Sequence, residues 1–263
     1  VEANRRLLEE ERGAIVRDWG GRLPIALVYA NSYRVGMSSL GFQTIYRLFA
    51  SHPDIVCERA FDDGRWDDSP PPLSIESQRR LDEFAVIAFS LSFELDYIRA
   101  ANLIRRCEMR PLASEREGVD PILIAGGPAV SANPMPLAPL FDAFVIGEAE
   151  EIAHDLCSAL AAHFGDRERL LRRLAELPGL YVPAVHGRRQ RVRRLWLDDL
   201  DRYPTRSTIW TAEAEFGDMH LVEATRGCRR GCRFCLAGHV SRPWRERSLE
   251  VVLDAAREGL PHR

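Results

Sequence analysis

Short apolar runs alternate with amphipathic stretches over the first two thirds of the chain. The runs are nearly continuous in apolar residues and are bounded by glycine, proline, asparagine or serine, which is typical of strands buried on both faces of a parallel sheet. We expect such strands at 24–29, 55–61, 84–90, 121–125 and 143–146. The amphipathic stretches between them predict helices at 40–51, 74–84, 96–106 and 150–163. In the helix at 96–106, the residues expected to face inward are Ile98, Ala101, Leu103 and Ile104.

This alternation predicts an α/β fold, a doubly wound parallel sheet over 23–165. We expect residues 1–22 to be an N-terminal helical extension, because charge and leucine alternate there up to a Gly-Gly break. Residues 166–205 should hold a helix at 167–177, a hairpin made of 180–183 and 191–196, and an acidic linker. A second domain is expected over 206–263, beginning near Ile209 and containing a helix from about 248 to 259.

Composition narrows the class of protein. Of the 263 residues, 46% are hydrophobic and 29% are charged, as in globular proteins with a full core. The net charge of −3 gives no basic field, so a nucleic-acid partner is not expected, and the arginine-rich stretch 186–194 is interpreted as a solvated turn. No apolar run suits a membrane span, and the N-terminal residues do not resemble a signal peptide. We therefore expect a cytoplasmic protein.

Three cysteines fall close together, at Cys228, Cys232 and Cys235, in the pattern C-x3-C-x2-C. They cannot all pair as disulfides, because one thiol is always left over. Thiolates converge readily on zinc, copper(I) or an iron–sulfur cluster. A bound cluster would be negatively charged, and four arginines lie in position to offset that charge, at 226, 229, 230 and 233. The stretch therefore predicts a metal centre.

The residues alone do not identify the metal. A structural zinc takes about four ligands, and the local candidates for the fourth are His220 and His239. An iron–sulfur cluster held by three cysteines instead keeps one iron open. The remaining cysteines, Cys57, Cys107 and Cys157, stand alone in apolar surroundings and are expected to be buried thiols in a reducing compartment.

The cysteine pattern resembles the radical S-adenosylmethionine (SAM) enzymes. Phe234 precedes the third cysteine as in that family, and the flanks 223–228 and 242–245 look like its cobalamin-binding-type branch. The resemblance implies that Cys228, Cys232 and Cys235 hold a 4Fe–4S cluster whose open iron binds SAM. It further implies reductive cleavage of SAM with an electron from a donor such as ferredoxin or flavodoxin, and an unknown small-molecule substrate. No catalytic residue is identified.

The glycine-rich loops resemble a cobalamin-binding-type, Rossmann-like domain. That domain carries D-x-H-x-x-G in its first loop, where this chain has Asn31, Tyr33 and Gly36. Its glycine pair matches Gly126 and Gly127, and the serine of its middle strand corresponds to Ser90 or Ser92. The resemblance implies that cobalamin is bound by Asn31, Tyr33, Gly36, Gly126 and Gly127. Because a phenol is a poor ligand for cobalt, we expect any bound cobalamin to lack a protein histidine on cobalt, and a domain that has lost the cofactor is the alternative.

After the cysteines the sequence has room for one βα unit, whereas radical SAM enzymes use a partial (β/α) barrel. We therefore expect 206–263 to be the N-terminal fragment of that barrel, with its remainder in a longer chain, and the isolated chain to be inactive. Two alternatives stay open. One is a methylthiotransferase-like enzyme, with Cys57, Cys107 and Cys157 as a second cluster site. The other is a non-catalytic Rossmann-like module with a structural zinc.

Overall fold

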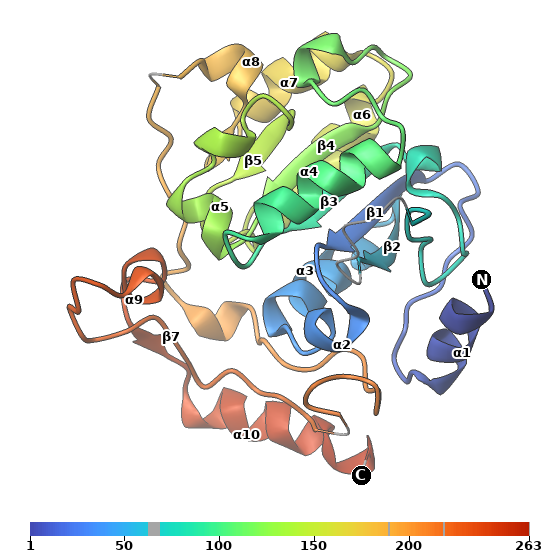
Figure 1. Ribbon diagram of the computed structural model, residues 1–263. Helices are drawn as coiled ribbons and strands as arrows, with labels where there is room; N and C mark the ends of the chain where they lie inside the picture. The colour runs from blue at the N-terminus through green and yellow to red at the C-terminus, as the bar shows by residue number, and fades with distance from the viewer. Residues whose placement is uncertain (63–68, 189, 218, 263) are drawn as a thin grey trace.

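A six-stranded sheet forms the centre of the molecule (Figure 1). The computed structural model describes residues 1–62, 69–188, 190–217 and 219–262. The strands are β1 (Leu23–Tyr29), β2 (Ile55–Phe61), β3 (Val86–Ser90), β4 (Ile122–Gly126), β5 (Ala143–Val145) and β6 (Leu180–Tyr181). Their order is β2-β1-β3-β4-β5-β6; the first five are parallel and β6 is antiparallel to β5. The expected α/β fold with a mainly parallel sheet is confirmed.

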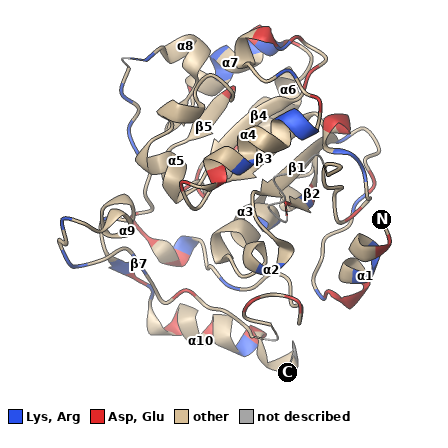
Figure 2. Ribbon diagram, in the orientation of Figure 1, with Lys and Arg blue, Asp and Glu red and all other residues tan. Residues whose placement is uncertain are grey.

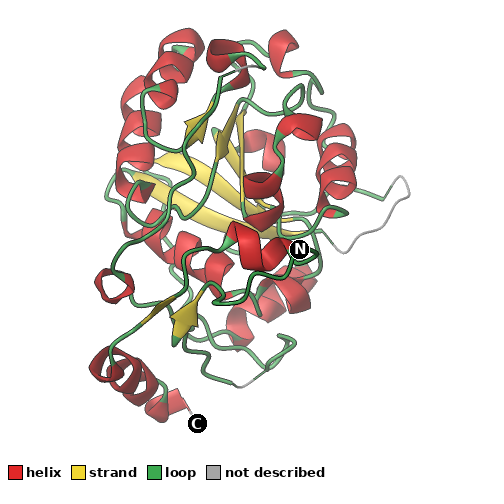
Figure 3. Ribbon diagram, turned by 90° about the vertical axis from the view of Figure 1, so that its left-hand side faces the viewer, coloured by secondary structure: helices red, strands yellow, loops and turns green. Residues whose placement is uncertain are grey.

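Helices cover both faces of this sheet (Figure 3). One face packs against α3 (Leu40–Ser51), α6 (Ala153–His163) and α7 (Arg167–Ala175), and the other against α4 (Asp96–Arg106) and α5 (Pro128–Ala132). Side chains alternate along each strand, so Ile25 and Leu27 of β1 enter the first layer while Ala26 and Val28 enter the second. This double burial explains why the strands appear in the sequence as continuous apolar runs.

The strand order β2-β1-β3-β4-β5 is the flavodoxin-like form of a doubly wound sheet. In such sheets the chain leaves β1 and β3 in opposite directions, which opens a crevice beyond the carboxyl ends of those strands. A short helix, α2 (Tyr33–Gly36), follows β1 at this edge, and the Gly126-Gly127 turn follows β4. The fold therefore directs attention to the carboxyl edge of the sheet.

The helix predicted at 74–84 is wrong; only the short 3-10 turn Leu81–Glu83 forms there. Residues 74–77 instead run along β2, where the Ile75 amide donates to the Arg59 carbonyl at 2.7 Å. The side chain of Glu76 is drawn inward to the buried Arg59 guanidinium, at 2.7 Å. Long-range polar contacts thus override the helical pattern of this stretch.

The inward face of α4 was predicted in part. Leu103 and Ile104 are buried as expected, together with Ala100, whereas Ile98 is 55% exposed and Ala101 is half-buried. The stripe that faces the sheet is rotated toward Ala100 because Asp96, the first residue of the helix, turns inward. Its carboxylate accepts the backbone N–H groups of Ser92 and Phe93, both at 2.9 Å.

The predicted hairpin of 180–183 with 191–196 is also wrong. Residues Leu180 and Tyr181 pair with β5, and the Tyr181 ring stacks on Phe144. The short helix α8 (Pro183–His186) follows, and Leu195 returns to form a single bridge with Gly147. The open edge of β5 therefore takes the segment that the local pattern assigned to a hairpin.

The N-terminal strap and the segment around Ile209 pack on the central domain. The N-terminal helix α1 covers Glu2–Glu10 only, and the following strap pairs Arg12 with Trp210 in both directions, at 3.0 and 2.9 Å. Ile209 is buried in the core, and its amide donates to the side chain of Gln43. The C-terminal part holds β7 (Thr225–Arg226), α9 (Leu236–Val240), β8 (Arg245–Glu246) and α10 (Leu249–Glu258), which confirms the last predicted helix. Among the described helices, none has the length and apolar character needed to cross a membrane.

Candidate functional site

The three clustered cysteines lie on one closed loop, residues 227–244, which we call the cysteine loop. It begins after β7 and ends before β8, and these strands pair Thr225 with Glu246 and Arg226 with Arg245. At the entry, Gly227 has a φ of +93°, and a Cβ there would lie 2.5 Å from the Pro243 carbonyl oxygen. The loop therefore needs glycine at its entry, where the incoming and outgoing chains are in contact.

The cysteine sulfurs accept backbone N–H groups within the loop. The Cys228 Sγ accepts from Arg230 at 3.4 Å, and the Cys235 Sγ accepts from Gly238 at 3.3 Å. A Cβ at Gly238 would lie 3.5 Å from the Cys235 Sγ and 3.8 Å from the Cys228 Cβ, so these two cysteines flank that glycine. The carbonyl of Cys232 accepts the Cys235 amide at 3.2 Å. The cysteines thus organise the loop through their own backbone and sulfur contacts.

The three cysteines are the candidate ligands of a metal centre. In the described part of the chain, no three or more His, Cys, Asp or Glu side chains are grouped so that they could hold a metal ion. The donor set nevertheless fits an iron–sulfur cluster chemically. All three thiols are free and half-buried, and two already accept N–H groups, the contacts that tune the sulfurs of such clusters.

Three of the four ring nitrogens of the two candidate histidines have hydrogen-bond partners. The Nδ1 of His220 lies 3.1 Å from the indole Nε1 of Trp210, and the Nε2 lies 2.7 Å from the carbonyl oxygen of Ala255. Because an indole N–H only donates, Nδ1 accepts and Nε2 carries the proton that goes to Ala255. Both ring nitrogens of His220 are therefore used. His239 places its Nε2 3.1 Å from the carbonyl oxygen of Cys232.

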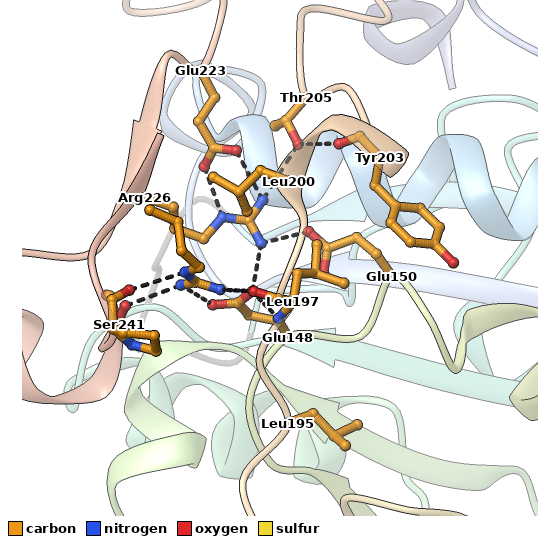
Figure 4. A network of polar contacts seen from close by, with 12 residues as sticks. Glu148, Glu150, Leu195, Leu197, Leu200, Tyr203, Thr205, Glu223, Arg226 and Ser241 are labelled. Carbon is orange, nitrogen blue, oxygen red and sulfur yellow. Dashed lines mark hydrogen bonds and ion pairs between the residues drawn. The ribbon is translucent and has the colours of Figure 1, made fainter. Parts of the chain in front are cut away.

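The flanks of the cysteine loop are fixed to the sheet by the Glu148 carboxylate (Figure 4). Arg245 donates to both oxygens of Glu148, from Nη2 at 2.8 Å and from Nη1 at 2.9 Å. The Nη1 of Arg226 donates to the same carboxylate at 3.0 Å, and the Leu197 amide donates at 2.9 Å. One carboxylate beyond the end of β5 therefore binds the arginines on both sides of the loop.

Arg226 is surrounded by carboxylates. Besides Glu148, its guanidinium donates to Glu150 at 2.7 Å and to both oxygens of Glu223 at 2.9 Å. Figure 4 shows these three acidic side chains directed at Arg226 from the two segments that flank it. The expectation that Arg226 offsets a cluster charge is therefore corrected, because its charge is balanced locally. Arg229, by contrast, lies over the ring of Trp244, 3.5 Å from its centroid.

The protonation states of this network are set by burial and by pairing. Burial alone would raise the pKa of Glu148, but the hydrogen bond from Arg245, the Leu197 amide and the charge of Arg226 bring that pKa below its ordinary value. Burial alone would lower the pKa of Arg226, and the hydrogen bond with Glu223 and the surrounding carboxylates raise it instead. Glu148 is therefore ionised at neutral pH and faces two cations.

A cavity of about 370 Å³ opens at the same place. Its inner part is apolar and lies between the sheet and helices α3 and α6, where it is lined by residues such as Leu27, Phe42 and Leu160. Its mouth is polar and is formed by the strand ends, by the Glu148 network and by the end of α9, with Ser90, Ser92, Gly126, Gly127, Glu150, Arg226 and Ser241. An apolar pocket of this size with a few polar groups at its mouth suits a small organic ligand.

The five residues expected to bind cobalamin lie in two different places in the structure. Gly126 and Gly127 line the cavity, whereas Asn31, Tyr33 and Gly36 do not. The Asn31 side chain accepts the next backbone amide at 2.8 Å, and a Cβ at Gly36 would lie 2.6 Å from the Phe61 ring.

The Tyr33 hydroxyl donates to Glu11 at 2.6 Å. Burial and that neighbouring carboxylate raise the Tyr33 pKa far above its ordinary value. The first loop is thus engaged in packing and does not offer a ligand to the cavity.

The three isolated cysteines are buried as predicted. Cys57 and Cys157 lie in the layer of α3 and α6, and Cys107 lies in the layer of α4, on the opposite face of the sheet. Burial raises the pKa of Cys107 and of Cys157 to about 12. Since the sheet separates Cys107 from the other two, these thiols do not form a common site.

Sequence analysis missed the partners of Glu148. The visible signal was a Gly-Glu-Ala-Glu stretch directly after a buried strand, since carboxylates at that edge of an α/β sheet often have a function. The arginine partners of Glu148 lie 78 and 97 residues further along the chain, and no local sequence pattern connects them to it. The pairing therefore required the tertiary structure.

Comparison with known proteins gives independent evidence on the family of this chain. The family described as "Radical SAM proteins, N-terminal" matches residues 41–183, just over half of the chain. An uncharacterized protein of Methanocaldococcus jannaschii, MJ0966, is 27% identical over 238 residues, which are 90% of this chain and 46% of that protein. The chain thus spans less than half the length of this relative. No solved structure matches.

Proposed function

Because this chain belongs to the family of radical SAM proteins, as their N-terminal region, we propose that Cys228, Cys232 and Cys235 bind one 4Fe–4S cluster, which in turn binds SAM. The observation that carries the proposal is the cysteine loop itself, where three free thiols lie on one short loop and two of them accept backbone N–H groups. When bound, such a cluster supplies the electron for the reductive cleavage of SAM. Ferredoxin or flavodoxin is the proposed electron donor.

The residues of this chain have supporting roles in the proposal. The three cysteines are half-buried on an otherwise largely exposed loop, and Cys228 and Cys235 accept the N–H groups of Arg230 and Gly238, contacts that favour a thiolate. Gly227 lets the incoming chain lie against the backbone of Ser241 and Pro243, which closes the loop. All six cysteines are free, which suits the reducing cytoplasm that we propose as its location.

The proposal is tested by anaerobic reconstitution of the chain with iron and sulfide. We expect about four irons and a brown protein with charge-transfer absorption, as for a cubane cluster. The variant with alanine at 228, 232 and 235 should retain almost none. The matched control places alanine at Cys57, Cys107 and Cys157 and should keep the iron. A colourless protein that takes up zinc, or a triple variant that retains its iron, would refute the assignment.

We further propose that residues 206–263 begin a radical SAM barrel that continues in a longer chain. Helix α10 supports this, because its apolar residues Leu249 and Leu253 are exposed, as is Phe234 of the cysteine loop. The relative from M. jannaschii is about twice as long as the matched region. The substrate would then be recognised by segments beyond the sequence described here.

For the central domain we propose an organic ligand in the cavity at the carboxyl edge of the sheet. Cobalamin is a candidate because Gly126 and Gly127 line the mouth, and an apolar pocket follows. The first loop does not fit the histidine-ligated form, since Tyr33 stands at that position and its hydroxyl is bound to Glu11. Any cobalamin bound here should therefore have no protein histidine on cobalt.

Titration with hydroxocobalamin tests this second proposal. We expect either no binding at tens of micromolar, the result for a domain that has lost the cofactor, or binding without a nitrogen ligand from the protein. Electron paramagnetic resonance of the reduced cobalt(II) form distinguishes the ligands. Nitrogen superhyperfine splitting that persists with cobinamide, which lacks the nucleotide base, would show that a protein nitrogen binds cobalt and that the proposal is wrong.

Two observations weigh against the alternatives. A methylthiotransferase-like second cluster would need Cys57, Cys107 and Cys157 on one side of the sheet, and they lie on both. A structural zinc would need a fourth ligand near the cysteine loop. Both ring nitrogens of His220 already bind Trp210 and Ala255, and the Nε2 of His239 lies against the carbonyl of Cys232, which leaves the Nδ1 of His239 as the local imidazole nitrogen. We therefore keep the cluster as the proposed function.

A further inference from the structure

We propose that Glu148 is the positioning residue of the cysteine loop: it holds the two ends of the loop together at the mouth of the cavity. The inference deepens the proposed function, because the loop is the proposed cluster site. Arg226 lies two residues before Cys228, and Arg245 follows the end of the loop. Both donate to the same carboxylate, Arg245 through two nitrogens at 2.8 and 2.9 Å and Arg226 through one at 3.0 Å.

The Arg245–Glu148 contact is strong because it is an ion pair, because it is bidentate, and because both side chains are largely buried. The side chains of Glu148, Arg245 and Arg226 are 12%, 8% and 16% exposed. At such burial, bulk water cannot replace a lost ionic partner, and hydrogen bonds to charged groups contribute more than neutral ones. The ladder of β7 and β8 is only two residues long on each side, so these ion pairs provide much of what closes the loop.

The position of Glu148 is itself fixed by the backbone. The amide of Gly147 donates to the Ser131 hydroxyl at 2.8 Å, and the amide of Glu148 donates to the Leu195 carbonyl at 3.1 Å. Gly147 has a φ of +106°, and Leu195 lies directly against it. The carboxylate therefore projects from a rigid turn beyond β5, and it can act as a reference point for a loop that has little regular structure.

The result is that the cysteine loop and the cavity share a wall. Glu148, Arg226 and Ser241 line the mouth of the cavity, and α9, which follows Cys235, packs beside α5. If Glu148 releases its arginines, Arg226 still pairs with Glu150, but Arg245, at the outgoing end of the loop, loses its ion pair with the edge of the sheet. Glu148 need not touch the cluster or the substrate to control where the three thiols lie.

The test measures the accessibility of the cysteines in the iron-free chain. Wild type and Glu148→Gln are treated with a small alkylating reagent, and the rate at each cysteine is followed by peptide mass spectrometry. We expect Cys228, Cys232 and Cys235 to react at least about tenfold faster in the variant, because the buried guanidinium of Arg245 loses its carboxylate partner and Arg226 keeps only Glu150 and Glu223. The matched control is Glu151→Gln, an exposed neighbour whose carboxylate pairs with Arg202 at 3.2 Å; it should leave all rates unchanged.

The buried cysteines act as an internal standard for folding. Cys57, Cys107 and Cys157 should remain slow in Glu148→Gln; if they become fast, the variant has unfolded globally and Arg245→Met replaces it as the test. Arg245→Met removes the two-armed contact from the other side and should give the same local increase. The double variant should be no worse than the more severe single one, since both remove one interaction. Equal rates at the cluster cysteines in the wild type and in both single variants would overturn the proposal.

Reconstitution then separates this inference from the proposed function. If thiol rates rise in Glu148→Gln and the wild type binds iron, the reduced cluster of the variant should show an altered electron paramagnetic resonance spectrum at an equal iron content. If rates rise but the wild type binds no iron, the positioning role stands and the cluster assignment fails. If the wild type binds iron and the thiol rates do not differ, the positioning role alone is refuted.

Discussion

Arg59→Met is expected to lower the free energy of unfolding by about 3–5 kcal/mol, because it leaves carboxylates buried without their cation. The side chain of Arg59 is fully buried, as is that of Glu11, and Glu76 is 2% exposed. Arg59 donates to both oxygens of Glu11, at 2.6 and 2.7 Å, and to Glu76 at 2.7 Å. Its guanidinium also lies over the ring of Tyr46, 4.9 Å from the centroid.

The loss should depend on pH, and its sign follows from the carboxylates. Burial raises the pKa of Glu76 even with Arg59 present, and removing the cation raises the folded-state pKa further. A carboxylate whose pKa is higher in the folded than in the unfolded state is stabilising only where it is protonated, below the unfolded value, and that stability is lost as pH rises through the folded value. The deficit of Arg59→Met should therefore be larger at pH 7 than at pH 4.

Urea denaturation of the iron-free chain at both pH values measures this effect. The control is Arg6→Met, which removes the exposed pair with Glu10, whose side chains are 74% and 43% exposed. That change should leave the free energy of unfolding essentially unchanged, because solvent screens the exposed pair. A loss of less than about 1 kcal/mol for Arg59→Met at pH 7, or a deficit that grows toward acid, would contradict the assigned role of the ion triad.

The Arg59 triad also shows where sequence reasoning stops. The strand that carries Arg59 was predicted from its apolar run, and it forms at Ile55–Phe61. The partners of Arg59 lie far from it in the sequence, since Glu11 comes from the N-terminal strap and Glu76 from a stretch predicted as a helix. Periodicity reports which face of an element is apolar, but it does not report which distant charge will meet a buried one.

The same distinction applies to the candidate site. The five parallel strands, the glycine turn after β4 and the cysteine spacing are local features that can be located in the sequence, whereas β7 and β8 were not predicted. For the first loop, the spacing of Asn31, Tyr33 and Gly36 resembles a ligand loop, and the structure adds that the hydroxyl of Tyr33 donates to Glu11, from a segment that precedes the domain. A motif gives the spacing of its residues, and their direction depends on what packs against them.

Gly147→Ala is expected to cost about 3 kcal/mol or more of unfolding free energy, while Gly165→Ala costs only about 1 kcal/mol. Both glycines have similar backbone conformations, with φ of +106° and +102°, so the strain of placing a side chain in the left-handed region is common to both. They differ in their surroundings. A Cβ at Gly147 would lie 2.1 Å from the carbonyl oxygen of Leu195, whereas a Cβ at Gly165 meets nothing within 4 Å.

The additional cost at Gly147 has a local consequence that a general loss of stability lacks. To accept a methyl group, Leu195 must move, and its carbonyl would then no longer accept the amide of Glu148, which it now does at 3.1 Å. The carboxylate of Glu148 would be displaced from Arg226 and Arg245. Thermal unfolding of the two variants measures the difference in stability, and alkylation of the cysteine loop should be faster in Gly147→Ala alone. Equal melting temperatures for the two variants would show that the close approach of Leu195 does not constrain this turn.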